Sequence, residues 1–522
     1  MRDVAREAAG VFSSARQVAA LTLLSRILGL LRDSVCAAIF GSGPEWGAFA
    51  FAFRIPNLFR RLFGEGALSA AFIPTFNELY EREGPDVAWR LFRRTFAALL
   101  AVLGGLLVLL YAASLVAGAF LSGRERWYLV FPLTNVLLPY LLLVCVTAFF
   151  GAALEARKHF TAPAASQVVT NVFWIAGAVA ALWLGKGLSQ KIFLVAVGTL
   201  LGGVASLAMH LPVLARRGAP LRPQWSLADP SLSRIARSMT PIVLGLTIVQ
   251  VNVLLDGLIA RVFISNEADG HLYFANRLFQ FPLAMLGISL GTAVFPSLTQ
   301  LAARRQDAEL RRVATHALDV TLFLAIPAAF ALAVLDRQTV SLFFQYGRFN
   351  AFKTDIVAPI LACYSLGLPA HCGVQVLVRM FYTAGDMRTP VRVALLAMVL
   401  NLALNLALVF SIREAGLAFA TTISACLQFT LLFAIAARRL KMIDREMLLV
   451  RILRSTALAA LMGLVMILVA GACRHALPAA GLKGRALAAF VPAVLGGALY
   501  LGVAALLRFD ELAGLGRRSK PA

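Results

Sequence analysis

Charged side chains are scarce in this sequence. Asp, Glu, Lys and Arg together make up 14% of its 522 residues, whereas soluble proteins carry about 25%. Acidic residues are the rarer kind, with 26 Asp and Glu against 49 Lys and Arg, so the formal net charge is +23. This deficit of charge excludes a globular enzyme with a solvated surface. Hydrophobic residues take the place of charged ones, at 60% of the chain with a mean hydropathy of +0.80.

The motifs of several function classes are absent as well. The sequence has no G-x-x-x-x-G-K-[ST] motif for ATP, and no basic domain with interleaved aromatic residues for nucleic acid. A membrane enzyme acting on a polyprenyl phosphate would need a carboxylate pair or a metal site near a large loop, and no such cluster occurs. We therefore expect a protein that is not an enzyme and binds no nucleic acid.

Cysteine is also rare, and its placement excludes a metal or disulfide framework. The six cysteines lie within or beside apolar runs, and none shows C-x-x-C spacing. We expect them to be small buried residues, and we expect no resident cofactor.

Apolar runs recur along the chain from residue 17 to residue 508. Each is long enough to cross about 30 Å of hydrocarbon, which takes about 20 residues. We predict an all-α, polytopic membrane protein with about fourteen transmembrane helices. The predicted spans cover residues 17–40, 46–78, 95–120, 128–155, 161–184, 190–214, 234–262, 271–300, 313–335, 355–384, 389–411, 415–437, 450–473 and 484–508.

Lys and Arg gather in alternate loops. Arg93 and Arg94 follow the second predicted span, whereas residues 41–46 contain neither Lys nor Arg. The positive-inside bias therefore predicts that the even-numbered loops and both termini lie in the cytoplasm. One presumed outer loop is an exception, and its Phe344 and Phe349 favour an amphipathic segment at the membrane interface.

The sequence contains an internal repeat. Arg54 and Arg277, in similar motifs of the second and eighth spans, are 223 positions apart, and Pro74 and Pro296 are 222 apart. Because both copies lie in spans of the same parity, the repeats are parallel. This predicts two six-helix lobes related by a pseudo-two-fold axis, with a central site between them and two extra C-terminal helices. The expected parts of this monomer are an N-terminal lobe at 1–215, a cytoplasmic linker at 216–233, a C-terminal lobe at 234–437, and the extra helices with a cytoplasmic tail at 438–522.

Most of the ionisable groups inside the predicted spans are guanidinium groups. Such groups are costly in a membrane, at about 2.5–3.5 kcal/mol each, and mark function. Arginine stays charged and binds phosphate oxygens bidentately. We expect Arg26, Arg32, Arg60 and Arg277 to line a cavity for a phosphate or pyrophosphate, with Asp33 pairing with a neighbouring arginine.

The second span carries further candidates. Gly64, Glu65 and Gly66 form the best candidate for a flexible bend, and kinked helices can open a gap between lobes for a lipid tail. Arg54 and Arg61 also lie in this span, but for them snorkelling to the interface has equal weight.

A cation site is a second hypothesis. Asn401 and Asn405 share one helix face, and with Asp256 and Thr421 they offer hard oxygen ligands suited to Na⁺. Hydrogen bonding between helices explains the same residues. Either Na⁺ or Cl⁻ could serve as counter-ion for a cavity that returns empty and positive.

Several motifs carry a resemblance to a known family. They are Ser25-Arg26-Ile27-Leu28-Gly29, Arg32-Asp33, Arg54-Ile55-Pro56-Asn57-Leu58-Phe59-Arg60-Arg61, Gly64-Glu65-Gly66-Ala67 and Gln345-Tyr346-Gly347-Arg348-Phe349. They resemble the signature of the MurJ (MviN) lipid II flippases, and the resemblance runs from residue 16 to about residue 508.

The resemblance implies a fold of the multidrug/oligosaccharidyl-lipid/polysaccharide exporter superfamily. It also implies that the four cavity arginines are essential and that the four oxygen ligands named above can hold Na⁺. The sequence departs from some relatives at Asn405, where they have an aspartate, and at Gly47, where they have an aspartate early in the second span.

The expected function is a flippase that carries lipid II, the undecaprenyl-pyrophosphate-linked disaccharide peptide, from the inner to the outer leaflet by alternating access, for cell-wall synthesis. Two alternatives stay open from the residues alone. One is a flippase for another polyprenyl-linked oligosaccharide, such as an O-antigen or capsule unit. The other is a membrane-embedded polyprenyl-phosphate glycosyltransferase.

Overall fold

The computed structural model describes residues 2–64, 67–121, 123–226, 230–476, 481–509 and 511. Within these ranges the chain forms helices and no strands. It divides into two compact units. Unit 1 comprises Met1–Gly257, Ser265–Gly270 and Tyr346–Arg348, and unit 2 comprises Leu258–Ile264, His271–Gln345 and Phe349–Ala522.

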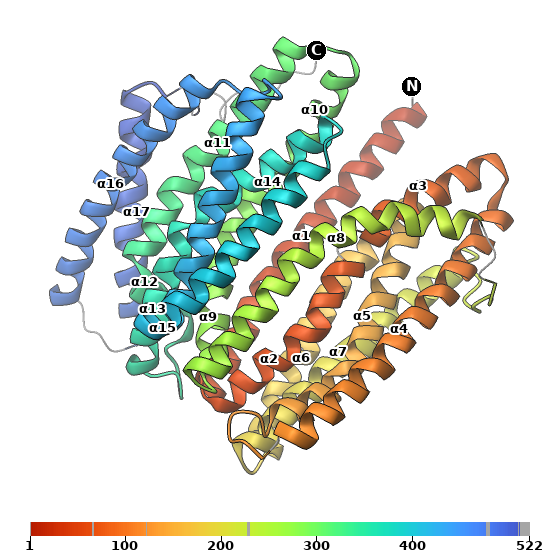
Figure 1. Cartoon of the computed structure of the whole chain (residues 1–522), viewed down its shortest axis with the longest axis horizontal. Coiled ribbons are helices and arrows are strands. Elements are labelled where there is room, and N and C mark those ends of the chain that lie inside the picture. Colours follow the sequence, from red (N-terminus) through yellow and green to blue (C-terminus); the bar gives the residue numbers. More distant parts are fainter. Residues whose placement is uncertain are drawn as a thin grey trace. The chain divides into compact units, whose positions relative to one another are not determined.

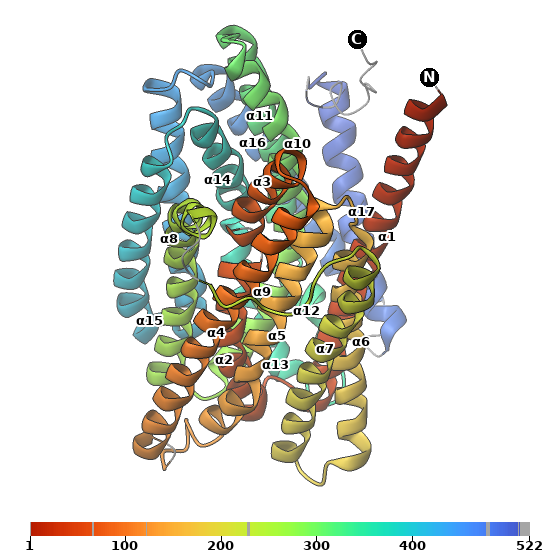
Figure 2. The same cartoon turned by 90° about the vertical axis from the view of Figure 1, so that its right-hand side faces the viewer.

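Several helices of unit 1 pack on helices that are not their neighbours along the chain. They are α1 (Arg2–Phe40), α2 (Pro44–Phe59), the π-helix η1 (Arg60–Gly64), α3 (Ala67–Arg82), α4 (Pro85–Leu121), α5 (Val130–Ala156), α6 (Thr161–Leu184), α7 (Leu188–Arg216) and most of α8 (Pro230–Ile259). The α5 helix contacts α2, α3, α4 and α7, and α6 packs between α1 and α7. Figure 2 shows α6 and α7 side by side, joined by a short loop.

The helices of unit 2 surround α11. They are the π-helix η2 (Ala260–Ile264), α9 (Ala268–Pro282), the π-helix η3 (Leu283–Ile288), α10 (Ser289–Ala303), α11 (Asp307–Val334), α12 (Asp336–Phe344), α13 (Ala351–Leu366), α14 (Leu368–Thr383), α15 (Arg388–Arg438), α16 (Arg445–Ala476) and α17 (Leu482–Leu506). The α11 helix contacts α10, α13, α14 and α16, and α16 pairs with α17 at the edge of the unit in Figure 1.

Each of the fourteen predicted spans coincides with helix, so the fold-class prediction is confirmed. Ten helices or helix pairs in the described ranges are long and apolar enough to cross a membrane, and the bent pair α13–α14 makes eleven. One of the ten, α15, contains two predicted spans, because its backbone is non-helical at Ile412 and Arg413. The remaining two predicted spans, α1 and the α2–α3 segment, are those with several charged side chains.

A π-helical turn occurs at matching places in the internal repeat. In the second span it begins at Arg60, and in the eighth span it begins at Leu283, which is 283 − 60 = 223 positions later. This is the same offset that separates Arg54 from Arg277. A π turn takes up one residue more than an α turn and often marks a functional site. The repeat therefore extends from the sequence motif to the local backbone geometry.

Aromatic packing fixes the core of unit 1 on the side of α3 and α4. The rings of Phe72, Phe76, Phe92 and Phe149 are all fully buried and in contact. Phe92 stacks on Phe149, and the other pairs, including Trp89 with Phe76, are tilted or edge-to-face. Such ring pairs contribute about 0.5–1.5 kcal/mol each beyond the area that they bury. This cluster holds α3 and α4 rigidly against α5.

The predicted amphipathic segment at the interface is wrong for two of its aromatic residues. Phe344 and Phe349 are fully buried, and both rings pack on Phe274 of α9 within unit 2. Apolar burial against a protein core outweighs partial burial among lipid headgroups, because more of each ring is removed from water. The basic Arg337 of this segment pairs with Asp355 at 2.8 Å.

Two short segments that interrupt unit 2 in sequence, Ser265–Gly270 and Tyr346–Arg348, belong to unit 1 by their contacts. The backbone N–H of Arg348 donates to the carbonyl of Ala38 at the end of α1 at 2.9 Å. Next to it, Gly347 has a φ of +53°, and a Cβ there would overlap the same Ala38 carbonyl. A glycine is therefore required where this loop crosses the end of α1.

Candidate functional site

Arg32 and Asp33 of α1 form a buried ion pair. The Nε and Nη2 atoms of Arg32 donate to Oδ1 of Asp33 at 2.9 Å and 2.8 Å. Asp33 is fully buried and Arg32 is 9% exposed. The pair confirms the expected role of Asp33 as partner of a neighbouring arginine.

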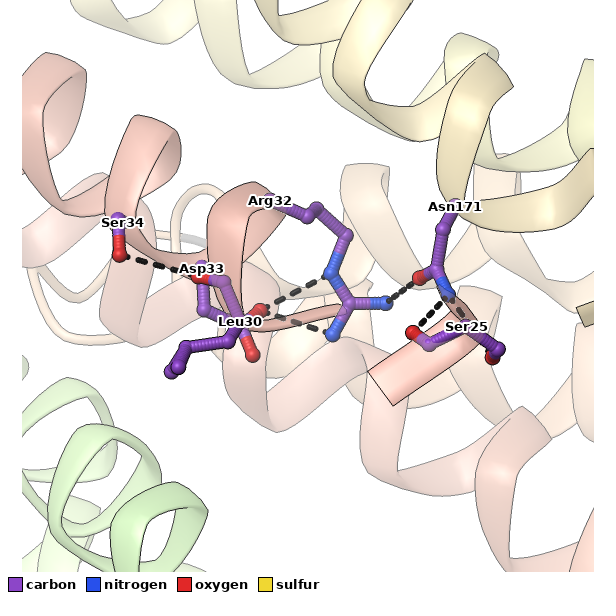
Figure 3. Close-up of polar contacts among 6 residues, drawn as sticks. All are labelled: Ser25, Leu30, Arg32, Asp33, Ser34 and Asn171. Atoms are coloured by element: carbon purple, nitrogen blue, oxygen red, sulfur yellow. Dashed lines mark hydrogen bonds and ion pairs between the residues drawn. The ribbon is translucent and has the colours of Figure 1, made fainter. Parts of the chain in front are cut away.

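A second helix completes the surroundings of Arg32. Its Nη1 donates to Oδ1 of Asn171 on α6 at 3.1 Å, and its guanidinium lies 4.1 Å from the ring centroid of Trp174. Asn171 in turn donates to the carbonyl of Ser25 on α1 at 3.1 Å (Figure 3). Arg32 thus links α1 to α6 through a hydrogen bond and a cation–π contact, and these add to its ion pair with Asp33 in offsetting the cost of burying its charge.

Sequence reasoning missed Asn171 and Trp174. A signal was present, because Asn171 is a polar side chain in the middle of an apolar span, and such residues bond across helices. What the sequence did not reveal is that α6 is the helix packed on α1.

Arg26 differs from Arg32 in having no partner. It lies six residues before Arg32 on α1 and is half-buried. In the ranges that the structure describes, its side chain makes no hydrogen bond or ion pair. A half-buried guanidinium in this position is able to bind an anionic group without first breaking an existing bond.

Arg60 is the first residue of the π-helix η1. Its Nε donates to Oδ1 of Asn57, one turn earlier, at 3.0 Å. Arg32 and Arg60 both belong to unit 1, so the structure places two of the predicted arginines, from separate elements, in one compact unit.

The expected gate falls partly within the described residues. Gly64 is the last residue of η1, whereas Glu65 and Gly66 lie outside the described ranges. The irregular backbone before them agrees with a bend in the second span, since kinks in helices occur at π turns.

Arg54 does not snorkel to the interface. Its Nη2 lies 3.1 Å from Oδ1 of the fully buried Asp269, and its Nη1 donates to the carbonyl of Val253 at 3.0 Å. A Cβ at Gly257 would overlap the guanidinium, so a glycine of α8 makes room for it. Asp269 was also missed from the sequence, where it reads as an ordinary first-turn acid of a helix that follows a loop.

Arg277 is half-buried in unit 2, on α9. Its neighbours Asn276 and Gln280 are hydrogen-bonded to each other. The other three predicted arginines belong to unit 1, so their convergence with Arg277 stays a prediction.

The three unit 2 residues of the hypothetical cation site form a hydrogen-bonded chain. Nδ2 of Asn405 donates to Oδ1 of Asn401 at 2.8 Å, and Nδ2 of Asn401 donates to Oγ1 of Thr421 at 3.3 Å. Oδ1 of Asn401 and Oγ1 of Thr421 accept these two bonds, as interhelical hydrogen bonding requires. Binding of Na⁺ by these residues stays a prediction. Asp256 belongs to unit 1.

Comparison with known proteins agrees with this architecture. Among solved structures, one described as lipid II flippase MurJ in an inward closed conformation superposes with a TM-score of 0.77 at 22% identity, covering 95% of this chain and 99% of that one. An inward-facing multidrug resistance MATE family transporter of the MOP superfamily superposes with a TM-score of 0.68 at 15% identity, covering 82% and 98%. Both likenesses concern the fold.

Sequence relatives cover most of the chain. A protein of Vibrio cholerae serotype O1 described as probable lipid II flippase MurJ is 33% identical over 432 residues, covering 80% of this chain and 81% of that protein. The lipid II flippase MurJ of Burkholderia cenocepacia is 32% identical, covering 81% and 83%. The family model for lipid II flippase MurJ matches residues 36–478. The chain therefore belongs to the MurJ family of lipid II flippases.

Proposed function

We propose that this protein flips lipid II from the inner to the outer leaflet of the bacterial inner membrane, for peptidoglycan synthesis. The observation that carries the proposal is the match of residues 36–478 to the lipid II flippase family. The membrane-spanning helices and the transporter fold support a carrier rather than an enzyme, and the family favours lipid II over another polyprenyl-linked oligosaccharide.

Some of the proposed site residues contact the pyrophosphate directly, and others position the residues that do. Arg26, half-buried and without a partner in the described ranges, is the first receptor for the pyrophosphate. Arg60 adds a second guanidinium from the π turn, and Arg277 is proposed to supply a third from unit 2. Bidentate bonding between guanidinium and phosphate oxygens gives these contacts their strength.

Arg32 and Asp33 have a different proposed part. Because Arg32 is already bonded to Asp33 and Asn171, it is less available than Arg26 for a direct contact. Its full charge still raises the electrostatic potential in the surrounding part of unit 1. We propose that the Arg32–Asp33 pair positions α1 so that Arg26 faces the substrate.

The membrane potential supplies a direction for this transport. The pyrophosphate carries roughly two negative charges, and an inside-negative potential favours anion export by about 2.3 kcal/mol per charge per 100 mV. Return of the empty, cationic protein opposes this. We propose that Cl⁻ or Na⁺ balances the return step. Substitution of Na⁺ by choline, or of Cl⁻ by gluconate, should slow turnover if that ion takes part.

We also propose that the protein works as a monomer with both termini and the Arg-rich loops in the cytoplasm. This orientation follows the positive-inside bias. Labelling of a single introduced cysteine beside Arg90 from one side of the membrane tests it.

The deciding experiment measures translocation of lipid II by the purified protein in proteoliposomes. Fluorescent lipid II that reaches the outer leaflet is detected by its access to an external quencher. A polyprenyl-pyrophosphate carrying an unrelated oligosaccharide is the matched substrate control. We expect lipid II to be translocated faster than the control, and Arg26→Gln to abolish the difference. Equal translocation of both lipids would remove the substrate assignment.

A further inference from the structure

A cationic pocket in unit 2 is lined by none of the arginines discussed so far. The break at Ile412 and Arg413 folds α15 into two legs, residues 388–411 and 414–438. A cavity of about 440 Å³ lies where the start of the first leg meets the end of the second. Arg392 lines it from the first leg, and Arg438 and Arg439 line it from the second.

The guanidinium groups of this pocket are not satisfied by the protein. In the described part of the chain, the side chains of Arg392, Arg438 and Arg439 make no hydrogen bond or close ion pair. The carboxylate of Asp386, which interacts electrostatically with Arg439, is occupied just before α15, where it accepts from Oγ1 and N of Thr389 at 2.6 Å and 3.0 Å. These bonds from Thr389, with a smaller effect of Arg439, hold the pKa of Asp386 below its usual range.

The pocket therefore has an excess of positive charge. Three arginines line the pocket, and in the described part of the chain only Arg439 has a described interaction with a carboxylate, that of Asp386, which leaves about two positive charges to be balanced from outside the protein. Guanidinium groups from two helices that face one cavity suit a phosphate, whose oxygens accept bidentate bonds from more than one arginine. The cavity volume also falls in the range of about 300–1,000 Å³ that is usual for small-molecule sites.

An apolar stripe begins at one of these arginines. Leu395, Leu396 and Val399 follow Arg392 at intervals of three, four and seven residues, so all four lie on one face of the first leg. They are 48%, 52% and 57% exposed. Apolar side chains exposed on a membrane helix contact acyl chains, and basic pockets between such helices bind lipid headgroups. Because the stripe begins at Arg392, a lipid whose headgroup lies in the pocket could lay its acyl chain along it.

We propose that this pocket binds the phosphate of an anionic glycerophospholipid, whose acyl chain lies along the Leu395–Val399 stripe. The shared chemistry is that of a phosphate, which a soluble anion also offers. The stripe favours the lipid as its source, because a free phosphate would gain nothing from it. The unbalanced positive charge selects a lipid of net negative charge over a zwitterionic one.

The test is a lipid titration of the purified full-length protein in detergent, with bound lipid counted by native mass spectrometry. The probes are phosphatidylglycerol, phosphatidylcholine with the same acyl chains, and inorganic phosphate. The variant is R392Q/R438Q, which removes one arginine from each leg. The matched control is R90Q/R304Q, which removes two exposed arginines that lie outside the pocket and have no bond in the described ranges.

We expect R392Q/R438Q to bind phosphatidylglycerol at least about tenfold more weakly, since charge-assisted bonds are lost. The control variant and all phosphatidylcholine titrations should stay within about twofold of the unmodified protein. R392K/R438K should recover part of the affinity, because lysine keeps the charge without the planar fork.

Three results would overturn the proposal. One is an equal loss in the control variant, which would mean that surface charge alone attracts the lipid. Another is unchanged phosphatidylglycerol binding by R392Q/R438Q. A third is full competition by inorganic phosphate at equal affinity, which would assign the pocket to a soluble anion. If R392Q/R438Q does not fold, the single variants R392Q and R438Q replace it under the same criteria.

Discussion

The ion pair between Arg32 and Asp33 predicts a non-additive pair of substitutions. Asp33→Asn leaves the guanidinium of Arg32 buried at 9% exposure without its carboxylate partner. Removing one member of a buried ion pair costs about 3–5 kcal/mol. The bond to Asn171 and the Trp174 ring stay in place, and the ring alone retains about 0.5–2 kcal/mol. We therefore expect a loss of about 3 kcal/mol, at the lower end of that range.

Arg32→Gln should cost more than Asp33→Asn. It leaves the fully buried carboxylate of Asp33 without its partner and also removes the contacts with Asn171 and Trp174. The double variant R32Q/D33N leaves no buried charge at either position. Its loss should be smaller than the sum of the two single losses by about 2–3 kcal/mol.

Equilibrium unfolding of the four proteins in mixed micelles measures this coupling. Flipping of lipid II by the same preparations separates stability from transport. If R32Q/D33N is stable but inactive, Arg32 contacts the substrate in addition to holding α1. Additive losses within about 0.5 kcal/mol would refute the reasoning, because they would show that the two side chains do not share one buried interaction.

Three other expectations can be checked with single variants. Arg26→Ala should abolish flipping while changing the unfolding free energy by less than about 0.5 kcal/mol, because Arg26 has no bond in the described ranges; a large loss of stability would contradict this. Gly347→Ala should be about 1–3 kcal/mol more destabilising than Gly385→Ala, since both have positive φ but only Gly347 abuts the Ala38 carbonyl; equal melting temperatures would exclude the contact. Burial, together with Arg217, holds the pKa of His159 below its ordinary 6.5. Between that lowered pKa and 6.5 the unfolded chain binds more protons than the folded one, so the stability of the protein should fall as pH drops below 6.5. His159→Gln should flatten this part of a melting-temperature profile between pH 7.5 and 5.5, and an unchanged slope would exclude His159 as its origin.

The sequence predicted the helices well because each depends on local properties. A run of about 20 apolar residues is sufficient to specify a span, and breakers such as the residues around Ile412 specify where one ends. The internal repeat could also be recognised from the sequence, because Arg54 and Arg277 lie in similar motifs at a fixed offset.

The partners of the buried charges could not be predicted from the sequence. The carboxylate that pairs with Arg54 comes from residue 269, and the amide that bonds to Arg32 comes from residue 171. These pairs depend on which helices pack together, and apolar periodicity does not encode that choice. The burial of Phe344 and Phe349 was mispredicted for the same reason, since an amphipathic segment looks alike whether it faces lipid or another helix.

The paired π turns at Arg60 and Leu283 have a mechanical consequence. Each takes up one residue more than a regular α turn, and neighbouring turns can exchange that residue by shifting a few backbone hydrogen bonds. A residue that passes from one side of such a turn to the other is rotated by about 100° around the helix axis and moved by about 1.5 Å along it. Arg60 stands at that boundary, so a slip of one position would re-aim its guanidinium without unwinding the span.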